Sequence, residues 1–136
     1  MQEPGLARVE LDELLARSRV VSLHARLTPE TQGMIGAREL SLLPPGGVLV
    51  NTARGGLVDE NELADALESG RLGAAGLDVY AVEPPAPDAR IRRAPRVVLA
   101  PHLAGATRQT AERAVAMVAD EVARYVNGEP LEHAVR

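Results

Sequence analysis

The segment that most constrains the fold is a short apolar run at residues 48–50, which is followed at once by polar residues and then by a helix signal. Residues 44–47, Pro-Pro-Gly-Gly, precede the run, so it has the pattern of a buried strand that begins after a turn. Asp59 is a suitable N-cap for the next helix, with Glu62 three residues later and Gly70 as its end. The sequence therefore predicts a strand, a short turn and a helix in immediate succession.

The rest of the chain repeats this alternation. Strands are expected at residues 20–23, 74–79 and 97–100, and helices at 11–18, in a brief segment from Thr28, at 37–42 and over a long stretch at 107–127. Strands alternating with helices indicate a parallel sheet with right-handed crossovers. The apolar strands fit a sheet covered on both faces. Four strands are too few for a closed barrel, so we expect an α/β fold with an open, doubly wound parallel sheet.

Length and composition limit the other possibilities. The 136 residues suit one domain, 1–136, with a moderate core. Cysteine is absent, which excludes a disulfide framework and a thiolate nucleophile. All 15 basic residues are arginines, so lysine Schiff-base chemistry is excluded as well.

The charge pattern and the N-terminus bear on partners and location. The net charge is −4, and the only concentration of arginines lies in a short loop at residues 90–96, so nucleic acid is not an expected partner. No run approaches the ~18 apolar residues of a membrane span, and the N-terminus lacks the pattern of a signal peptide. We expect a cytoplasmic protein with no membrane partner.

Polar residues occur at the end of each predicted strand. His24, Thr52 with Arg54, Asp78 and His102 lie at or just beyond four different strand ends. Because the carboxyl ends of parallel strands meet at one edge of a sheet, these side chains are expected at the edge where ligands bind.

The residue types indicate a class of chemistry. His102 can donate and accept a proton near neutral pH, and Glu83 is a carboxylate that can orient it. Arg54 can bind a substrate carboxylate in bidentate fashion. No metal site is expected, since the three histidines lack ligand spacing. Together these residues suit hydride transfer to a carbonyl with a proton moving to its oxygen, which requires a nicotinamide cofactor.

Four strings, VSLHARLTPET, VLVNTARGGLVDENEL, GLDVYAVEPP and LAPHLAGAT, carry a family resemblance. In this order and spacing they resemble the second half of the NAD-binding domain of the D-isomer-specific 2-hydroxyacid dehydrogenases, a group that includes phosphoglycerate and glyoxylate/hydroxypyruvate dehydrogenases. The resemblance covers nearly the whole chain, and four linked motifs make it far more specific than one.

The resemblance implies an NAD-dependent oxidoreductase that acts on a small D-2-hydroxy acid or 2-oxo acid, and a homodimer in the full-length family. It makes Arg54 the substrate-binding catalytic arginine, Glu83 the partner of the histidine and His102 the proton donor. Asp78 is similar to the residue that bonds the nicotinamide carboxamide. The other cofactor contacts implied are Ala25, Thr52, Ala53, Arg54, and the turn from His102 to Gly105.

The chain also departs from the family pattern. No G-x-G-x-x-G turn for the pyrophosphate occurs in the sequence, and its glycines have other spacings. Arg26 stands where the family usually has proline, and Arg19 where it often has aspartate. The separate substrate domain is missing too. We therefore expect a partial Rossmann-like domain, a piece of a longer enzyme or a truncated reading frame, that is inactive alone.

A second hypothesis stays open, in which the chain is a non-catalytic module that senses NAD(H) or assembles with a partner. Part of the family acts as transcriptional co-repressors that keep the triad. Judged singly, Arg54 is also compatible with a surface ion pair and Glu83 with a plain turn residue. His24 is expected to have a structural or cofactor-edge role, and His133 to be solvated.

Overall fold

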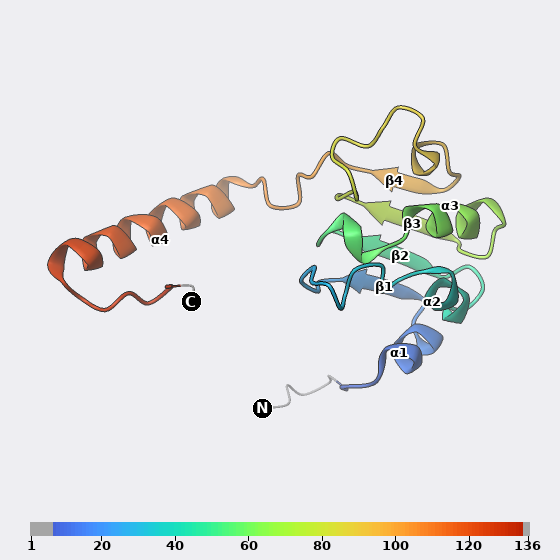
Figure 1. Cartoon of the computed structure of the whole chain (residues 1–136), viewed down its shortest axis with the longest axis horizontal. Coiled ribbons are helices and arrows are strands. Elements are labelled where there is room, and N and C mark those ends of the chain that lie inside the picture. Colours follow the sequence, from blue (N-terminus) through green and yellow to red (C-terminus); the bar gives the residue numbers. More distant parts are fainter. Residues whose placement is uncertain (1–6, 135–136) are drawn as a thin grey trace. The chain divides into compact units, whose positions relative to one another are not determined.

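The computed structural model describes residues 7–134 and contains a four-stranded parallel sheet in the order β1-β2-β3-β4 (Figure 1). The strands are β1 (Val20–Leu23), β2 (Val48–Asn51), β3 (Ala74–Leu77) and β4 (Val97–Leu99). The helices are α1 (Leu11–Arg17), α2 (Ala37–Leu42), α3 (Glu60–Glu68) and α4 (Arg108–Asn127), with 3₁₀ turns η1 (Gly55–Leu57) and η2 (Arg90–Arg92). The α/β class with a parallel sheet is confirmed.

The strand order explains how the helices are arranged. Each strand joins the sheet beside its predecessor, so every connection advances in the same direction. Right-handed crossovers that all advance in one direction lie on one face of a sheet. In agreement, α1 packs on α2, α2 on α3, and α3 on η2. The core lies between this layer and the sheet, and its fully buried members include Leu15, Leu40, Leu49, Leu63 and Leu67.

The opposite face of the sheet is not covered within this unit. Buried and more exposed residues alternate along β1, β2 and β3, which is the pattern of a one-sided sheet. Val20 is 60% exposed and Val98 72% exposed. The expectation of cover on both faces is therefore met on one face only. The sequence predicts cover on both faces because a valine on an open sheet face cannot be distinguished by residue type from a valine in the core.

The structure confirms one local signal in the sequence and contradicts another. Asp59 caps α3 as expected, since its Oδ1 accepts hydrogen bonds from the backbone N–H groups of Asn61 and Glu62 at 3.0 and 3.2 Å. The helix expected from Thr28 is wrong. Its carbonyl accepts from the amides of Thr31 and Gln32, but the chain leaves this single turn at Gly33, where φ is +64°.

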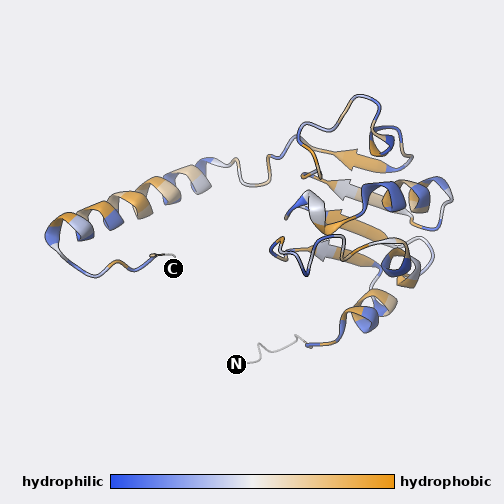
Figure 2. Cartoon of the chain, in the orientation of Figure 1, coloured by the Kyte–Doolittle hydropathy of each residue, from blue (hydrophilic) through white to orange (hydrophobic). Residues whose placement is uncertain are grey.

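The described chain divides into two compact units, one ending at His102 and one beginning at Leu103. The second unit holds α4, which the side chain of Thr107 caps and a left-handed Gly128 ends. Hydrophobic and hydrophilic positions alternate along α4 (Figure 2), and none of its residues is buried. No helix in the described part of the chain combines the length and apolar character needed to cross a membrane.

Candidate functional site

The register of the sheet places four polar or functional segments in one row. Leu23 pairs with Asn51, Asn51 with Leu77, and Leu77 with Leu99, and these are the last residues of the four strands. The residues that follow them, His24, Thr52, Asp78 and Ala100, therefore leave the sheet from neighbouring positions at its carboxyl edge. This edge is where ligands bind in open parallel sheets.

A hollow of about 680 Å³ lies at the ends of β1 and β2. Its lining brings together four of the residues implied as cofactor contacts, Ala25, Thr52, Ala53 and Arg54. The remaining lining residues are His24, Arg26 and Leu27. The small alanine side chains leave space in this hollow, while Thr52 contributes a hydroxyl and the arginines contribute positive charge.

Asn51 shapes the backbone on which Arg54 is carried. Its side chain is buried, with 1% exposure; Nδ2 donates to the carbonyl of Arg54 at 2.9 Å, and Oδ1 accepts from the amide of Ala53 at 3.1 Å. The Arg54 guanidinium is exposed and donates to the Ala53 carbonyl at 2.6 Å. Asn51 is the first of the polar residues that follow the predicted strand at 48–50, and the sequence alone assigns it no role. A buried amide directly before a turn was the available signal, since such a group must find hydrogen-bond partners.

Glu83 and His102 form a hydrogen-bonded pair. His102 Nδ1 lies 2.7 Å from Glu83 Oε2, and the other carboxylate oxygen, Oε1, accepts from the amide of Tyr80 at 3.0 Å. The bond from His102, then that from the Tyr80 amide, lowers the pKa of Glu83 from its usual value of 4.5, so the carboxylate is favoured. An ionised carboxylate at Nδ1 fixes the imidazole orientation and leaves Nε2 for another partner.

The backbone of His102 has an unusual conformation. Its φ is +56°, in the left-handed region that only a few per cent of residues other than glycine adopt, among which asparagine, aspartate and histidine are enriched. Such conformations persist where surrounding interactions hold them, and they concentrate at functional sites. The same residue thus combines a directed side chain with an uncommon backbone conformation.

Two further predicted residues are placed differently. Asp78 is 5% exposed and follows β3 directly, and its amide donates to the Asn51 carbonyl at 3.0 Å. The predicted strand ending at residue 79 is two residues too long, so Asp78 lies beyond the ladder and not inside it. Gly105 belongs to the second unit, and its contact with the cofactor stays a prediction.

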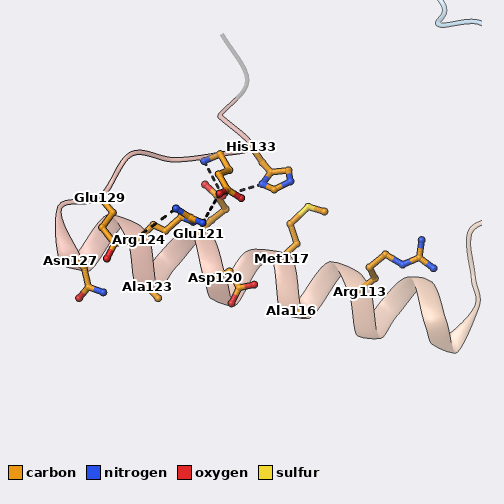
Figure 3. A pocket seen from close by; sticks show the side chains of 11 residues that line it. Arg113, Ala116, Met117, Asp120, Glu121, Ala123, Arg124, Asn127, Glu129 and His133 are labelled. Atoms are coloured by element: carbon orange, nitrogen blue, oxygen red, sulfur yellow. Dashed lines mark hydrogen bonds and ion pairs between the residues drawn. The ribbon is translucent and has the colours of Figure 1, made fainter. Parts of the chain in front are cut away.

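The second unit contains a separate polar cluster (Figure 3). Glu121 Oε1 lies 3.1 Å from His133 Nδ1 and 3.2 Å from the amide of Glu132, and Arg124 bonds the Glu132 carboxylate at 2.6 Å. The bond from His133 lowers the pKa of Glu121. His133 was expected to be solvated, and its side chain is half exposed as well as paired. The cluster includes none of the predicted site residues. Across residues 7–134, no group of three potential metal-ligating side chains could hold an ion.

We expect the Glu83–His102 pair to give a measurable pH dependence of stability. Because folding lowers the pKa of Glu83, its contribution is present above the usual value of 4.5 and is lost as the pH falls through the folded-state value. Urea unfolding between about pH 3 and pH 6 should show wild type more stable than Glu83→Gln at the upper end and equal to it at the lower end.

A matched control for this titration is Glu10→Gln. Glu10 precedes α1 and makes no side-chain capping bond, so this variant removes one surface carboxylate without breaking the pair. A constant difference between wild type and Glu83→Gln over the whole pH range would contradict the pairing.

Comparison with known proteins identifies the family to which this fold belongs. A family model described as "D-isomer specific 2-hydroxyacid dehydrogenase, NAD binding domain" matches residues 1–104. The chain belongs to this family. The family membership that the four motifs predict is thereby confirmed. The prediction of a Rossmann-like NAD-binding fold is confirmed as well.

Individual family members show how much of an enzyme the chain represents. It is 44% identical over 131 residues to a D-3-phosphoglycerate dehydrogenase of Mycobacterium tuberculosis, covering 96% of this chain and 25% of that protein. It is 43% identical over 128 residues to a glyoxylate reductase of Korarchaeum cryptofilum, covering 94% of this chain and 39% of that protein. The chain thus spans between a quarter and two fifths of these relatives.

A solved structure of the family supports the same fold. The NAD-complexed D-isomer specific 2-hydroxyacid dehydrogenase of Lactobacillus delbrueckii ssp. bulgaricus matches with a TM-score of 0.89 and 31% identity. The match covers 98% of this chain and 45% of that chain. The family is therefore one of NAD-dependent oxidoreductases, and the chain matches its NAD-binding domain.

Proposed function

We propose that this chain forms the catalytic edge of an NAD(H)-dependent oxidoreductase that interconverts a small D-2-hydroxy acid and its 2-oxo acid. The observation that supports this proposal most is the hydrogen bond between His102 and Glu83 beyond the sheet's carboxyl edge. A histidine oriented by a carboxylate is a suitable group for exchanging a proton with a substrate oxygen.

The residues present suit the nicotinamide end of the cofactor. The hollow beside Thr52 and Ala53 has small walls and polar groups, and Asp78 is an almost fully buried polar residue one strand away. We assign Ala25, Thr52 and Ala53 to the wall of the cofactor site and Asp78 to the carboxamide. When bound, the nicotinamide supplies or accepts the hydride. The chain has no glycine-rich turn for the pyrophosphate, so the phosphate end needs residues from elsewhere.

Each catalytic residue then has a distinct task. Arg54 binds the substrate carboxylate through its planar fork, which places the adjacent carbonyl or hydroxyl carbon. His102 gives a proton to the carbonyl oxygen during reduction and takes it from the hydroxyl during oxidation. Glu83 keeps Nδ1 of His102 bonded, so that Nε2 is the nitrogen that exchanges the proton.

Activity is expected only when the missing parts are supplied. We expect a graft, in which this chain replaces the matching 128 residues of the Korarchaeum cryptofilum glyoxylate reductase, to reduce glyoxylate or hydroxypyruvate with NADH or NADPH. The 136-residue chain alone should show no turnover, because it lacks the phosphate-binding turn. The assay follows the absorbance of the reduced nicotinamide.

The two arms of this experiment test different parts of the proposal. A graft that folds and binds the dinucleotide but does not reduce either acid contradicts the catalytic assignment and favours the non-catalytic, NAD-sensing module. Turnover by the isolated chain contradicts the expected need for a separate phosphate-binding half. Circular dichroism and a dinucleotide titration establish that the graft is folded and loaded before rates are compared.

A further inference from the structure

Tyr80 bonds Glu83 and the backbone just before His102 through different atoms. Its amide donates to Glu83 Oε1 at 3.0 Å. Its hydroxyl donates to the carbonyl of Ala100 at 2.8 Å, and the carbonyl of Leu77 lies farther away at 3.4 Å. Ala100 is two residues before His102, so one side chain fixes the backbone that leads to the histidine while its own amide fixes the glutamate.

The backbone of Tyr80 is itself held from two other directions. The amide of the next residue, Ala81, donates to Glu60 Oε1 of α3 at 2.6 Å. Gly55 packs directly on the same peptide, where an added Cβ would lie 1.8 Å from the carbonyl carbon of Tyr80 and 2.3 Å from the Ala81 nitrogen. Gly55 follows Arg54. The peptide between Tyr80 and Ala81 thus contacts the segment that carries the arginine as well.

The Tyr80 hydroxyl is a stable hydrogen-bond donor. Tyr80 is 8% exposed, and burial, together with the nearby charges of Asp78, Glu60 and Glu83, raises its pKa, so the hydroxyl keeps its proton and remains a donor. A buried aromatic ring needed only for packing would not require this hydroxyl. The bond to Ala100 is therefore an interaction that can be removed without removing the ring.

We infer that Tyr80 is a positioning residue, whose hydroxyl holds the His102 backbone in the place where the imidazole meets the Glu83 carboxylate. This inference rests on the proposed function only in the roles given to Glu83 and His102. The positioning itself is a property of the described unit and needs neither cofactor nor substrate. His102 has a left-handed φ of +56°, and the bond from Tyr80 to Ala100, two residues earlier, would help to hold this uncommon conformation.

The test compares Tyr80→Phe with Tyr125→Phe in the full 136-residue chain. Both variants remove one phenolic oxygen, and Tyr125, which is 76% exposed on α4, is the other tyrosine of the sequence. Loss of a hydrogen bond worth about 1 kcal/mol raises a local opening equilibrium roughly fivefold. In Tyr80→Phe, the amide of residue 80 should exchange with solvent about fivefold faster, while the Leu49 amide in the sheet keeps its rate.

The pKa of the Glu83 carboxyl, measured by an NMR titration, distinguishes positioning from a purely structural role, because loss of packing alone would leave this pKa unchanged. In Tyr80→Phe the pKa of Glu83 should rise toward its usual value, because His102 and the residue 80 amide hold the carboxylate less well. Asp78, whose charge already opposes ionisation of Glu83, is unchanged in both variants. Tyr125→Phe should leave the exchange rates and the titration as in wild type.

Two results would overturn the inference. One is an unchanged Glu83 titration together with unchanged exchange at residue 80. The other is equal acceleration at residue 80 and Leu49, which would mean general destabilisation without a positioning role. These measurements do not depend on turnover. An inactive graft would therefore not contradict the role of Tyr80, and failure of the Tyr80 test would not contradict the proposed dehydrogenase function.

Discussion

Replacing His102 by asparagine in the glyoxylate reductase graft is expected to lower kcat by about 10³-fold, since positioned acid–base groups contribute typically 10²–10⁴-fold. Asparagine is the informative choice. It tolerates the left-handed backbone found at residue 102, where φ is +56°, so the chain path is preserved while the proton-exchanging nitrogen is lost. The measurement is steady-state reduction of glyoxylate or hydroxypyruvate at saturating cofactor.

The expected pattern separates chemistry from binding. Arg54 and the hollow remain in place in His102→Asn, so KM for the acid should change far less than kcat. His133→Asn is the matched control, because it makes the same exchange at a histidine paired with Glu121 in the second unit, and its rate should stay within about twofold of the unmodified graft. A folded His102→Asn graft that retains a tenth or more of the rate would show that another group transfers the proton.

Gly55→Ala is expected to destabilise the isolated chain by about 3 kcal/mol, the upper end of what overpacking costs in a close-packed interior. An alanine Cβ would lie 1.8 and 2.1 Å from the carbonyl carbon and oxygen of Tyr80. Real contacts are never that short, and both neighbours are backbone atoms that no side-chain rotation can move away. Either η1 or the turn after β3 must shift. Urea unfolding measures the loss.

Gly76→Ala is the control for this effect. Gly76 lies within β3, and an added Cβ there would be 4.0 Å from Val50 Cγ2, an ordinary contact. We expect its stability to stay within about 1 kcal/mol of wild type, as for a strand glycine with free space. Equal stabilities for the two variants would mean that the close approach of Gly55 to Tyr80 is absent in solution. In the graft, Gly55→Ala should also reduce activity, because the clash lies between segments carrying Arg54 and Glu83.

Several elements were predictable because their signals are local. Residues 20–23 form β1 as predicted, and α3 begins after Asp59. Helix α4 ends at Gly128, which has a left-handed φ that glycine adopts readily. Caps and turns depend on one or two residue types, so they can be recognised before any tertiary contact is known. The row of polar strand ends was predictable for a similar reason, since parallel strands place their carboxyl ends together.

The errors occur where distant segments decide. Thr28 has a good helix start, but the chain bends at Gly33 and its amide bonds the Gly56 carbonyl instead of continuing a helix. The role of Tyr80 depends on the carbonyl of Ala100, which lies 20 residues away, and spacing in the sequence does not reveal that partner. The Glu83–His102 pair is expected from the motifs, whereas the bond that anchors it through Tyr80 depends on the three-dimensional fold.

The consecutive strand order has a practical consequence for handling the protein. With every crossover on one side, the face left uncovered within this unit carries Ser22, Val50, Gly76 and Val98, which pair across the four strands, and Val20 lies on the same side. Replacing Val20 or Val98 by a polar, β-favouring residue such as threonine is therefore the natural first step toward a concentrated sample of this unit. The helix-lined interior, on the other side of the sheet, needs no alteration for that purpose.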